Sequence, residues 1–147
     1  MQGIVCKVCG YISLKPEAPE KCPVCGAPKT SFEKKGDAIK TLQDVNNLTE
    51  LEKKHIPVIT VVRKCGFIPE GCHDVHSNIG QIQHPMLAEH YIMDIDFYID
   101  NAFAARVKLT PDKLNPAAAL HLKPGGGKLA VIAHCNLHGA WINNVNL

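Results

Sequence analysis

Short apolar runs separated by polar and turn-forming residues characterise the chain from residue 56 onward. Most of these runs are rich in β-branched residues, and the run over 91–99 alternates apolar and polar positions for much of its length. These features are typical of strands, and no long stretch has a convincing helical period. The pattern predicts five strands, over residues 56–62, 91–99, 102–109, 117–122 and 128–133.

Turn signals lie between these runs. Pro57 stands near the start of the first predicted strand, where its missing amide does least harm, and Pro124–Gly127 supplies a turn before the last one. Several short strands joined by turns are typical of an antiparallel sandwich of the immunoglobulin type. The sequence therefore predicts a mainly β fold.

The first fifty residues follow a different pattern, because four of the seven cysteines lie within the first 25. Residues 34–51 then mix charged and polar side chains, with a weak helical pattern at Ile39, Leu42 and Val45. We expect a small metal-binding domain over 1–36, a connector with one or two helical turns over 37–50, and a larger domain over 51–147.

The composition limits the classes of molecule that the protein is expected to bind. Hydrophobic residues make up 46% of the 147 residues and charged residues 20%, and the net charge of +2 is too small to indicate nucleic-acid binding. The N-terminus has no apolar signal region, and no apolar stretch approaches the ~18 residues of a membrane span. We expect no nucleic-acid or membrane partner and a cytoplasmic location, where cysteines serve as metal ligands or free thiols rather than disulfides.

Two knuckles of the pattern CxxCG, Cys6–Gly10 and Cys22–Gly26, have twelve residues between Cys9 and Cys22. A glycine after the second cysteine allows a sharp turn, so that backbone amides can point at the thiolates. Four thiolates in a tetrahedron bind zinc or a single iron, and the spacing does not separate these metals. The candidate ligands are Cys6, Cys9, Cys22 and Cys25.

With Tyr11, Pro19 and Phe32 around these knuckles, the segment over about residues 2–35 resembles the rubredoxin module at one end of rubrerythrins. The resemblance implies one iron that cycles between the ferrous and ferric states. A structural zinc ribbon is the alternative. A module this small buries little apolar surface, so the metal, at on the order of 10 kcal/mol for comparable sites, should supply most of its folding free energy.

A second set of candidate ligands is spread over the larger domain. The segment Ala133–Trp141 places Cys135 and His138 three positions apart at the end of an apolar run. Together with His55, His84 and His90, it offers four nitrogens and one sulfur to a single metal. Such ligands suit iron, copper or zinc rather than calcium or magnesium, and they do not choose among the three.

Three segments, Glu52–Ile59, His84–Ile92 and Cys135–Trp141, together resemble the desulfoferrodoxin and neelaredoxin family, the superoxide reductases, over about residues 48–147. The resemblance implies an immunoglobulin-like β-sandwich with one iron. It further implies that four histidine nitrogens lie roughly in a plane around this iron, that Cys135 is the axial sulfur, and that the opposite face is open. The four histidines are His55, His84, His90 and His138.

The same resemblance implies an oxidoreductase that reduces superoxide by one electron to hydrogen peroxide. The four-cysteine iron would relay the electron. An outside donor, such as a reduced rubredoxin or a flavoprotein reductase, would restore the ferrous state. The family also suggests a homo-oligomer.

Two neighbours of His55 bear on this function. Lys54 matches the lysine that the family places by the open position, where a cation would attract superoxide and donate a hydrogen bond to the nascent peroxide. The family's glutamate two positions before this histidine is replaced by Lys53, and Glu52 stands one place earlier. Whether Glu52 reaches the ferric iron instead is left open by the sequence.

The stretch Arg63–Gln83 departs from the family pattern because it is longer and richer in cysteine and histidine, with Cys65, Cys72, His73 and His76. A further metal site, a redox thiol pair and an unusual loop near the iron are all compatible with it. We favour a loop with free thiols and solvated histidines, since the spacing matches no familiar template. We interpret His121 and His134 as packing or hydrogen-bonding residues.

Two other classes of protein use similar residues. A blue-copper carrier normally needs a weak axial ligand such as methionine after its cysteine, but no methionine follows Met93, and five strong ligands exceed such a site. A non-catalytic electron carrier or a zinc-stapled metal-binding protein is the second alternative.

Overall fold

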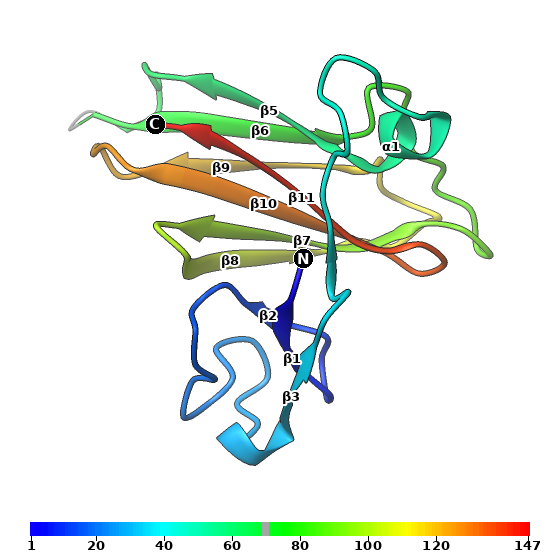
Figure 1. Cartoon of the computed structure of the whole chain (residues 1–147). Helices are drawn as coiled ribbons and strands as arrows, with labels where there is room; N and C mark the ends of the chain where they lie inside the picture. Colours follow the sequence, from blue (N-terminus) through cyan, green and yellow to red (C-terminus); the bar gives the residue numbers. More distant parts are fainter. Residues whose placement is uncertain (69–70) are drawn as a thin grey trace.

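A computed structural model describes residues 1–68 and 71–147 of the chain (Figure 1). The N-terminal segment forms a small antiparallel sheet in the order β2-β1-β3. Its elements are β1 (Gly3–Cys6), β2 (Ile12–Ser13), the single 3-10 turn η1 (Lys29–Ser31) and β3 (Phe32–Lys35).

Two larger sheets pack face to face above it. The five-stranded sheet has the order β4-β11-β10-β7-β8, with β4 (Ile39–Lys40), β7 (Ile92–Ile99), β8 (Ala102–Lys108), β10 (Lys128–Cys135) and β11 (Gly139–Asn146). The three-stranded sheet has the order β5-β6-β9, with β5 (Pro57–Val62), β6 (His73–Ile79) and β9 (Ala117–Leu122). The core between them includes Val75, Phe97 and Val131, all fully buried. The prediction of a mainly β, two-layered fold is confirmed.

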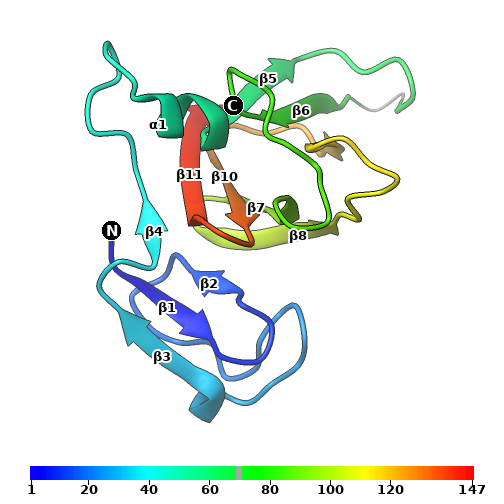
Figure 2. The same ribbon diagram turned by 90° about the vertical axis from the view of Figure 1, so that its right-hand side faces the viewer.

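The small sheet covers the outer face of the five-stranded sheet. Tyr98, Ala130 and Ile132 alternate along their strands with residues of the central core and belong to a second core shared with Tyr11 and Ile12. Both views place β1–β3 on the side of β7 and β8 that faces away from β5 and β6 (Figure 2). Because β10 is buried on both faces, its sequence is a continuous apolar run rather than an alternation.

Each of the five predicted strands is present, within two residues at either end. After residue 56, two strands of the described residues were not predicted. The segment that we interpreted as a loop over Arg63–Gln83 contains β6. One of the inward positions of β6 is the polar Ser77, so apolar and polar residues do not alternate clearly along this strand. Pro69 and Glu70 of that stretch lie outside the described residues. The second strand that the sequence did not predict is β11, which carries two adjacent asparagines, a residue type depleted in strands.

The prediction of helical turns around Ile39, Leu42 and Val45 is wrong. Ile39 is fully buried in β4, which pairs in parallel with β11, whereas Val45 is 73% exposed. The helix is α1 (Glu50–His55), and it begins where Thr49 can cap it. The Thr49 side chain accepts from the Glu52 amide while the Glu52 carboxylate accepts from the Thr49 amide, a capping box that satisfies two otherwise unpaired donors.

Among the described residues, no helix is long and apolar enough to cross a membrane.

Candidate metal centres

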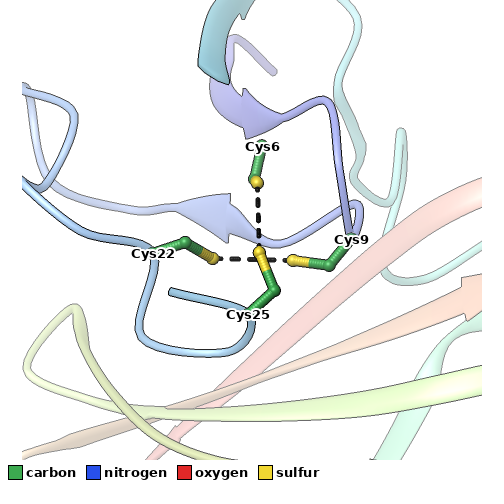
Figure 3. A group of neighbouring side chains, drawn as sticks. All are labelled: Cys6, Cys9, Cys22 and Cys25. Atoms are coloured by element: carbon green, nitrogen blue, oxygen red, sulfur yellow. Dashed lines mark hydrogen bonds between the residues drawn. The ribbon is translucent and has the colours of Figure 1, made fainter. Parts of the chain in front are cut away.

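The four cysteine sulfurs of the N-terminal segment converge from two turns (Figure 3). All four lie within 4.8 Å of one another, with Cys6 Sγ 3.8 Å from Cys25 Sγ and Cys9 Sγ 3.5 Å from Cys22 Sγ. A tetrahedron with metal–sulfur bonds of about 2.3 Å has edges of about 3.8 Å. The arrangement therefore fits a single tetrahedral metal ion.

The two knuckles have the same local structure. The amide of Gly10 donates to the Cys6 carbonyl, and the amide of Gly26 donates to the Cys22 carbonyl, each at 2.9 Å. These glycines adopt φ values of 73° and 76°, a left-handed conformation that other residues reach only with strain. The sequence CxxCG thus closes its turn through hydrogen bonds within the same five residues.

The surroundings of the thiols decide how readily each of them ionises. Burial raises the pKa of the Cys9 and Cys22 thiols, whereas a hydrogen bond from the Ala27 amide lowers the pKa of Cys25. Thiolates at the buried positions therefore need a positive charge at the centre of the cluster, which a zinc or iron ion provides.

The second candidate centre is a ring of four imidazoles. His55 ends α1, His84 and His90 lie between β6 and β7, and His138 lies in the turn between β10 and β11. Neighbouring ring centroids are 4.6 to 4.9 Å apart in the order 55, 84, 90, 138, and His55 and His90 face each other across the ring at 6.1 Å. The four side chains therefore form a closed ring in which each imidazole lies next to two others.

Two of these imidazoles point bare nitrogens at each other. His55 donates its Nδ1–H to the Leu51 carbonyl, and His84 donates its Nδ1–H to the Pro85 carbonyl, both at 2.7 Å. Burial lowers the pKa of both rings, that of His84 to about 4, so they are neutral at pH 7. Their Nε2 atoms then carry only lone pairs, yet they lie 3.2 Å apart.

A cation resolves this conflict. Nδ1 of His138 lies 3.1 Å from Nε2 of His55, and Nε2 of His90 is buried without a hydrogen-bond partner among the described residues. Adjacent nitrogens of a square site with bonds of about 2.1 Å are about 3.0 Å apart. The ring therefore fits a metal ion by its spacing and by its unpaired nitrogens.

Cys135 supplies the sulfur. It is the last residue of β10 and is buried, with Sγ 3.8 Å from Nδ1 of His138. The donor atoms of Cys135, His55, His90 and His138 all lie within 4.8 Å of one another. The five side chains thus come together, with His84 joined through His55.

Neighbouring residues hold this centre in place. Asn136 accepts from the Tyr91 amide and donates to the Glu89 carbonyl, which ties the loop of His90 to the turn after Cys135. Trp141 stacks on His55 with centroids 5.1 Å apart and donates its indole N–H to the His138 carbonyl. Such contacts orient ligand side chains before a metal binds.

Glu52 and Lys54 differ in their freedom to act at this site. The Glu52 carboxylate accepts hydrogen bonds from the amides of Gln43 and Thr49 and from the Thr49 hydroxyl, and the amide bonds lower its pKa. It is buried and committed to the helix cap rather than to the histidine ring. Lys54 is exposed in the last turn of α1, next to His55.

Sequence reasoning missed a charged network between the two centres. Asp96 is fully buried on β7 and pairs with Arg106, its partner on β8, through contacts of 2.6 and 2.7 Å. His134, the residue before Cys135, lies 3.0 Å from Asp96 Oδ2, in keeping with its interpretation as a hydrogen-bonding residue. Arg106 also donates to the Cys9 carbonyl at 2.7 Å. The sequence did contain a signal for this network, because Asp96 and Arg106 are charged residues within two predicted apolar strands.

The fold and the two donor sets define a metal-binding β-sandwich with an appended four-cysteine module. The family model described as desulfoferrodoxin matches residues 47–144, more than half of the chain. The chain belongs to the desulfoferrodoxin family. The model described as the rubredoxin-like domain of rubrerythrin matches residues 5–33.

Individual relatives agree with this assignment. A desulfoferrodoxin homolog of Archaeoglobus fulgidus is 30% identical over 142 residues, which cover 96% of this chain and 94% of that protein. A superoxide reductase of Pyrococcus abyssi is 34% identical over 106 residues, covering 65% and 88%. Among solved structures, a variant of the superoxide reductase (neelaredoxin) of Ignicoccus hospitalis superposes with a TM-score of 0.62 at 26% identity, covering 76% of this chain and 94% of that one.

Proposed function

We propose that the chain is a superoxide reductase, which converts superoxide to hydrogen peroxide by adding one electron and two protons. The observation that carries the proposal is the ring of four imidazoles whose unprotonated nitrogens converge beside the buried thiol of Cys135. Relatives named superoxide reductases, which are similar over most of their own length, support it. The division into residues 1–36, 37–50 and 51–147 is part of the same proposal.

In this proposal His55, His84, His90, His138 and Cys135 hold one iron, and the four N-terminal cysteines hold a second. Imidazole and thiolate donors exclude the hard cations, and five strong donors exceed a blue-copper site. Ferrous iron in the histidine centre would supply the electron that superoxide takes up. Zinc in place of the N-terminal iron would leave this reaction possible but would remove the internal relay.

Lys54 is the residue that we propose attracts superoxide. The pKa of His90 is lowered by burial first, then by the charge of His138 and also by that of Lys54, so the ammonium charge reaches the histidine ring. An exposed cation beside the site raises the local concentration of a small anion. We propose that its Nζ also donates a hydrogen bond to the developing peroxide while solvent supplies protons.

The buried charged network offers a route for the electron between the two centres. It runs from the Cys9 carbonyl to Arg106, then through Asp96 to His134, whose peptide bond leads to Cys135. Each hydrogen-bonded step is 3.0 Å or shorter. We propose that the N-terminal cluster accepts electrons from a reduced rubredoxin or a flavoprotein reductase and passes them along this route. A cytoplasmic location and a homo-oligomeric state complete the proposal.

The test uses protein purified without oxygen, with its metals measured before assay. We expect about two irons per chain and, with a supplied reductant, one peroxide formed for each superoxide consumed. Oxygen evolution would indicate dismutation instead. Copper in the histidine centre, or iron without superoxide consumption, would favour a non-catalytic electron carrier, and zinc in both centres would favour a zinc-stapled binding protein.

A further inference from the structure

The end of the sandwich remote from the histidine ring holds another group of potential metal ligands. Cys65, Cys72, Asp74 and His121 each offer one atom, and these four atoms all lie within 4.8 Å of one another. Asp74 and His121 face each other across the β6–β9 pair, while the two cysteines lie between β5 and β6. Figure 1 shows α1 and the start of β6 at opposite ends of the three-stranded sheet.

The contacts around His121 cannot all be ordinary hydrogen bonds. Its Nδ1 lies 2.7 Å from Asp74 Oδ1, 3.2 Å from Cys65 Sγ and 3.5 Å from Cys72 Sγ. A ring nitrogen carries either one hydrogen or one lone pair, so it satisfies one of these neighbours at a time. Four donor atoms that converge on one point are satisfied together by a shared cation.

We propose that Cys65, Cys72, Asp74 and His121 bind one Zn²⁺ in a closed, tetrahedral site. Zinc takes cysteine sulfur, histidine nitrogen and aspartate oxygen, and its structural sites fill all four positions with protein ligands. With bonds of about 2.3 Å to sulfur and about 2.0 Å to nitrogen and oxygen, tetrahedral edges of roughly 3.3 to 3.8 Å are expected.

Three of the separations that involve sulfur agree with these edges to within a few tenths of an ångström. They are 3.2 and 3.5 Å from the two sulfurs to Nδ1 of His121, and 3.6 Å from Cys72 Sγ to Asp74 Oδ1. The shorter Asp74–His121 contact of 2.7 Å would lengthen on binding. The Phe67 amide donates to Cys65 Sγ at 3.4 Å, an outer contact of the kind that stabilises a thiolate ligand.

A disulfide is the competing use of the two cysteines. It would employ only Cys65 and Cys72 and would leave Asp74 and His121 as a simple cross-strand pair. Zinc uses all four groups, and because it is not redox-active it ties the chain after β5 to β6 and β9 without carrying electrons. None of these ligands belongs to the other two centres, so this inference stands apart from the function proposed above.

The first experiment titrates Zn²⁺ into the full-length, reduced chain after both other centres have been loaded with iron. Calorimetry should detect one further site in the wild type. His121→Ala should weaken it by at least about 100-fold, because losing a ligand exceeds the 10- to 100-fold cost of losing an outer partner. The control, His76→Ala, changes an exposed histidine on β6, the strand that carries Asp74, and should leave zinc binding unchanged.

A second measurement needs no variant. Added Zn²⁺ should protect Cys65 and Cys72 of the iron-loaded wild type from alkylation, read peptide by peptide in a mass spectrometer, and a chelator should restore their reactivity. Equal alkylation with and without Zn²⁺, unchanged zinc affinity in His121→Ala, or a Cys65–Cys72 disulfide in protein purified without oxygen would each overturn the proposal.

Discussion

The four-cysteine cluster and the histidine ring bring their donor atoms together in opposite ways. In the cluster, two short segments supply every sulfur, and each closes its own turn through Gly10 or Gly26. In the ring, a helix end, a long loop and a strand end must meet, and the nitrogens of His55 and His138 touch across 83 positions of sequence. The cluster therefore depends on local turns and its metal, and the ring depends on the packing of the whole sandwich.

The largest expected effect tests the dependence of the cluster on its metal. Cys9→Ser should remove most of the metal-binding free energy, which is on the order of 10 kcal/mol for comparable sites, and should unfold β1–β3 while the sandwich persists. Hydrogen exchange resolved by segment measures this. The pre-reduced variant should still react directly with superoxide. Loss of that reaction would show that the N-terminal cluster is not only an electron relay and that the histidine centre does not react with superoxide by itself.

Cys135→Ser removes the sulfur ligand of the histidine centre, which is the second member of the comparison. The fold should remain because the sandwich core is intact, but the sulfur-to-iron charge-transfer absorption should vanish. Superoxide reduction should fall by at least about 1000-fold, beyond the 10- to 100-fold cost of losing an outer partner of a metal. Stopped-flow or pulse-radiolysis kinetics measure the rate, and full activity in this variant would remove Cys135 from the ligand set.

Arg106→Met tests the proposed electron route between the two centres without changing a ligand of either centre. It leaves Asp96 buried without its cationic partner, so stability should fall by about 3–5 kcal/mol, and electron transfer from the N-terminal iron to the histidine centre should slow. Thermal unfolding and flash reduction measure the two effects. Arg63→Met, at an exposed arginine, is the matched control. Unchanged transfer in Arg106→Met would mean that electrons take another route.

Lys54→Ala should have a smaller effect, confined to the histidine centre. The second-order rate with superoxide should fall several-fold and its dependence on ionic strength should flatten, because steering by one exposed charge is screened by salt. Lys53→Ala is the control, since Lys53 is paired with Glu50 on the same helix. Equal rates in wild type and Lys54→Ala would reduce this lysine to solvated surface.

The smallest effect concerns the helix that carries His55. Hydrogen bonds from the Gln43 and Thr49 amides hold the pKa of Glu52 below its ordinary 4.5, so its carboxylate stabilises the fold above that pH. This contribution is lost as pH falls through the folded-state pKa. Glu52→Gln should lower the melting temperature near pH 7, and the difference from wild type should narrow in acid. A constant difference across pH would contradict the cap.

Much of the fold was predictable because apolar runs mark strands wherever one face is buried. β6 escaped because Ser77 occupies an inward position and Asp74 and His76 surround Val75, so no apolar run marks it. Ile39 was misread because a two-residue parallel pairing with β11 depends on a strand one hundred positions away. Such pairings follow from register and packing, which short-range patterns do not encode.

The sequence by itself determined the two local knuckles and the set of donor types, since turn chemistry and ligand preference are properties of neighbouring residues and of side-chain atoms. Only the tertiary structure decided that Arg106 links the two centres, and that Asp74 and His121 meet Cys65 and Cys72. These meetings depend on which strands pair and which faces pack, and the free energy that selects them is spread over the whole core.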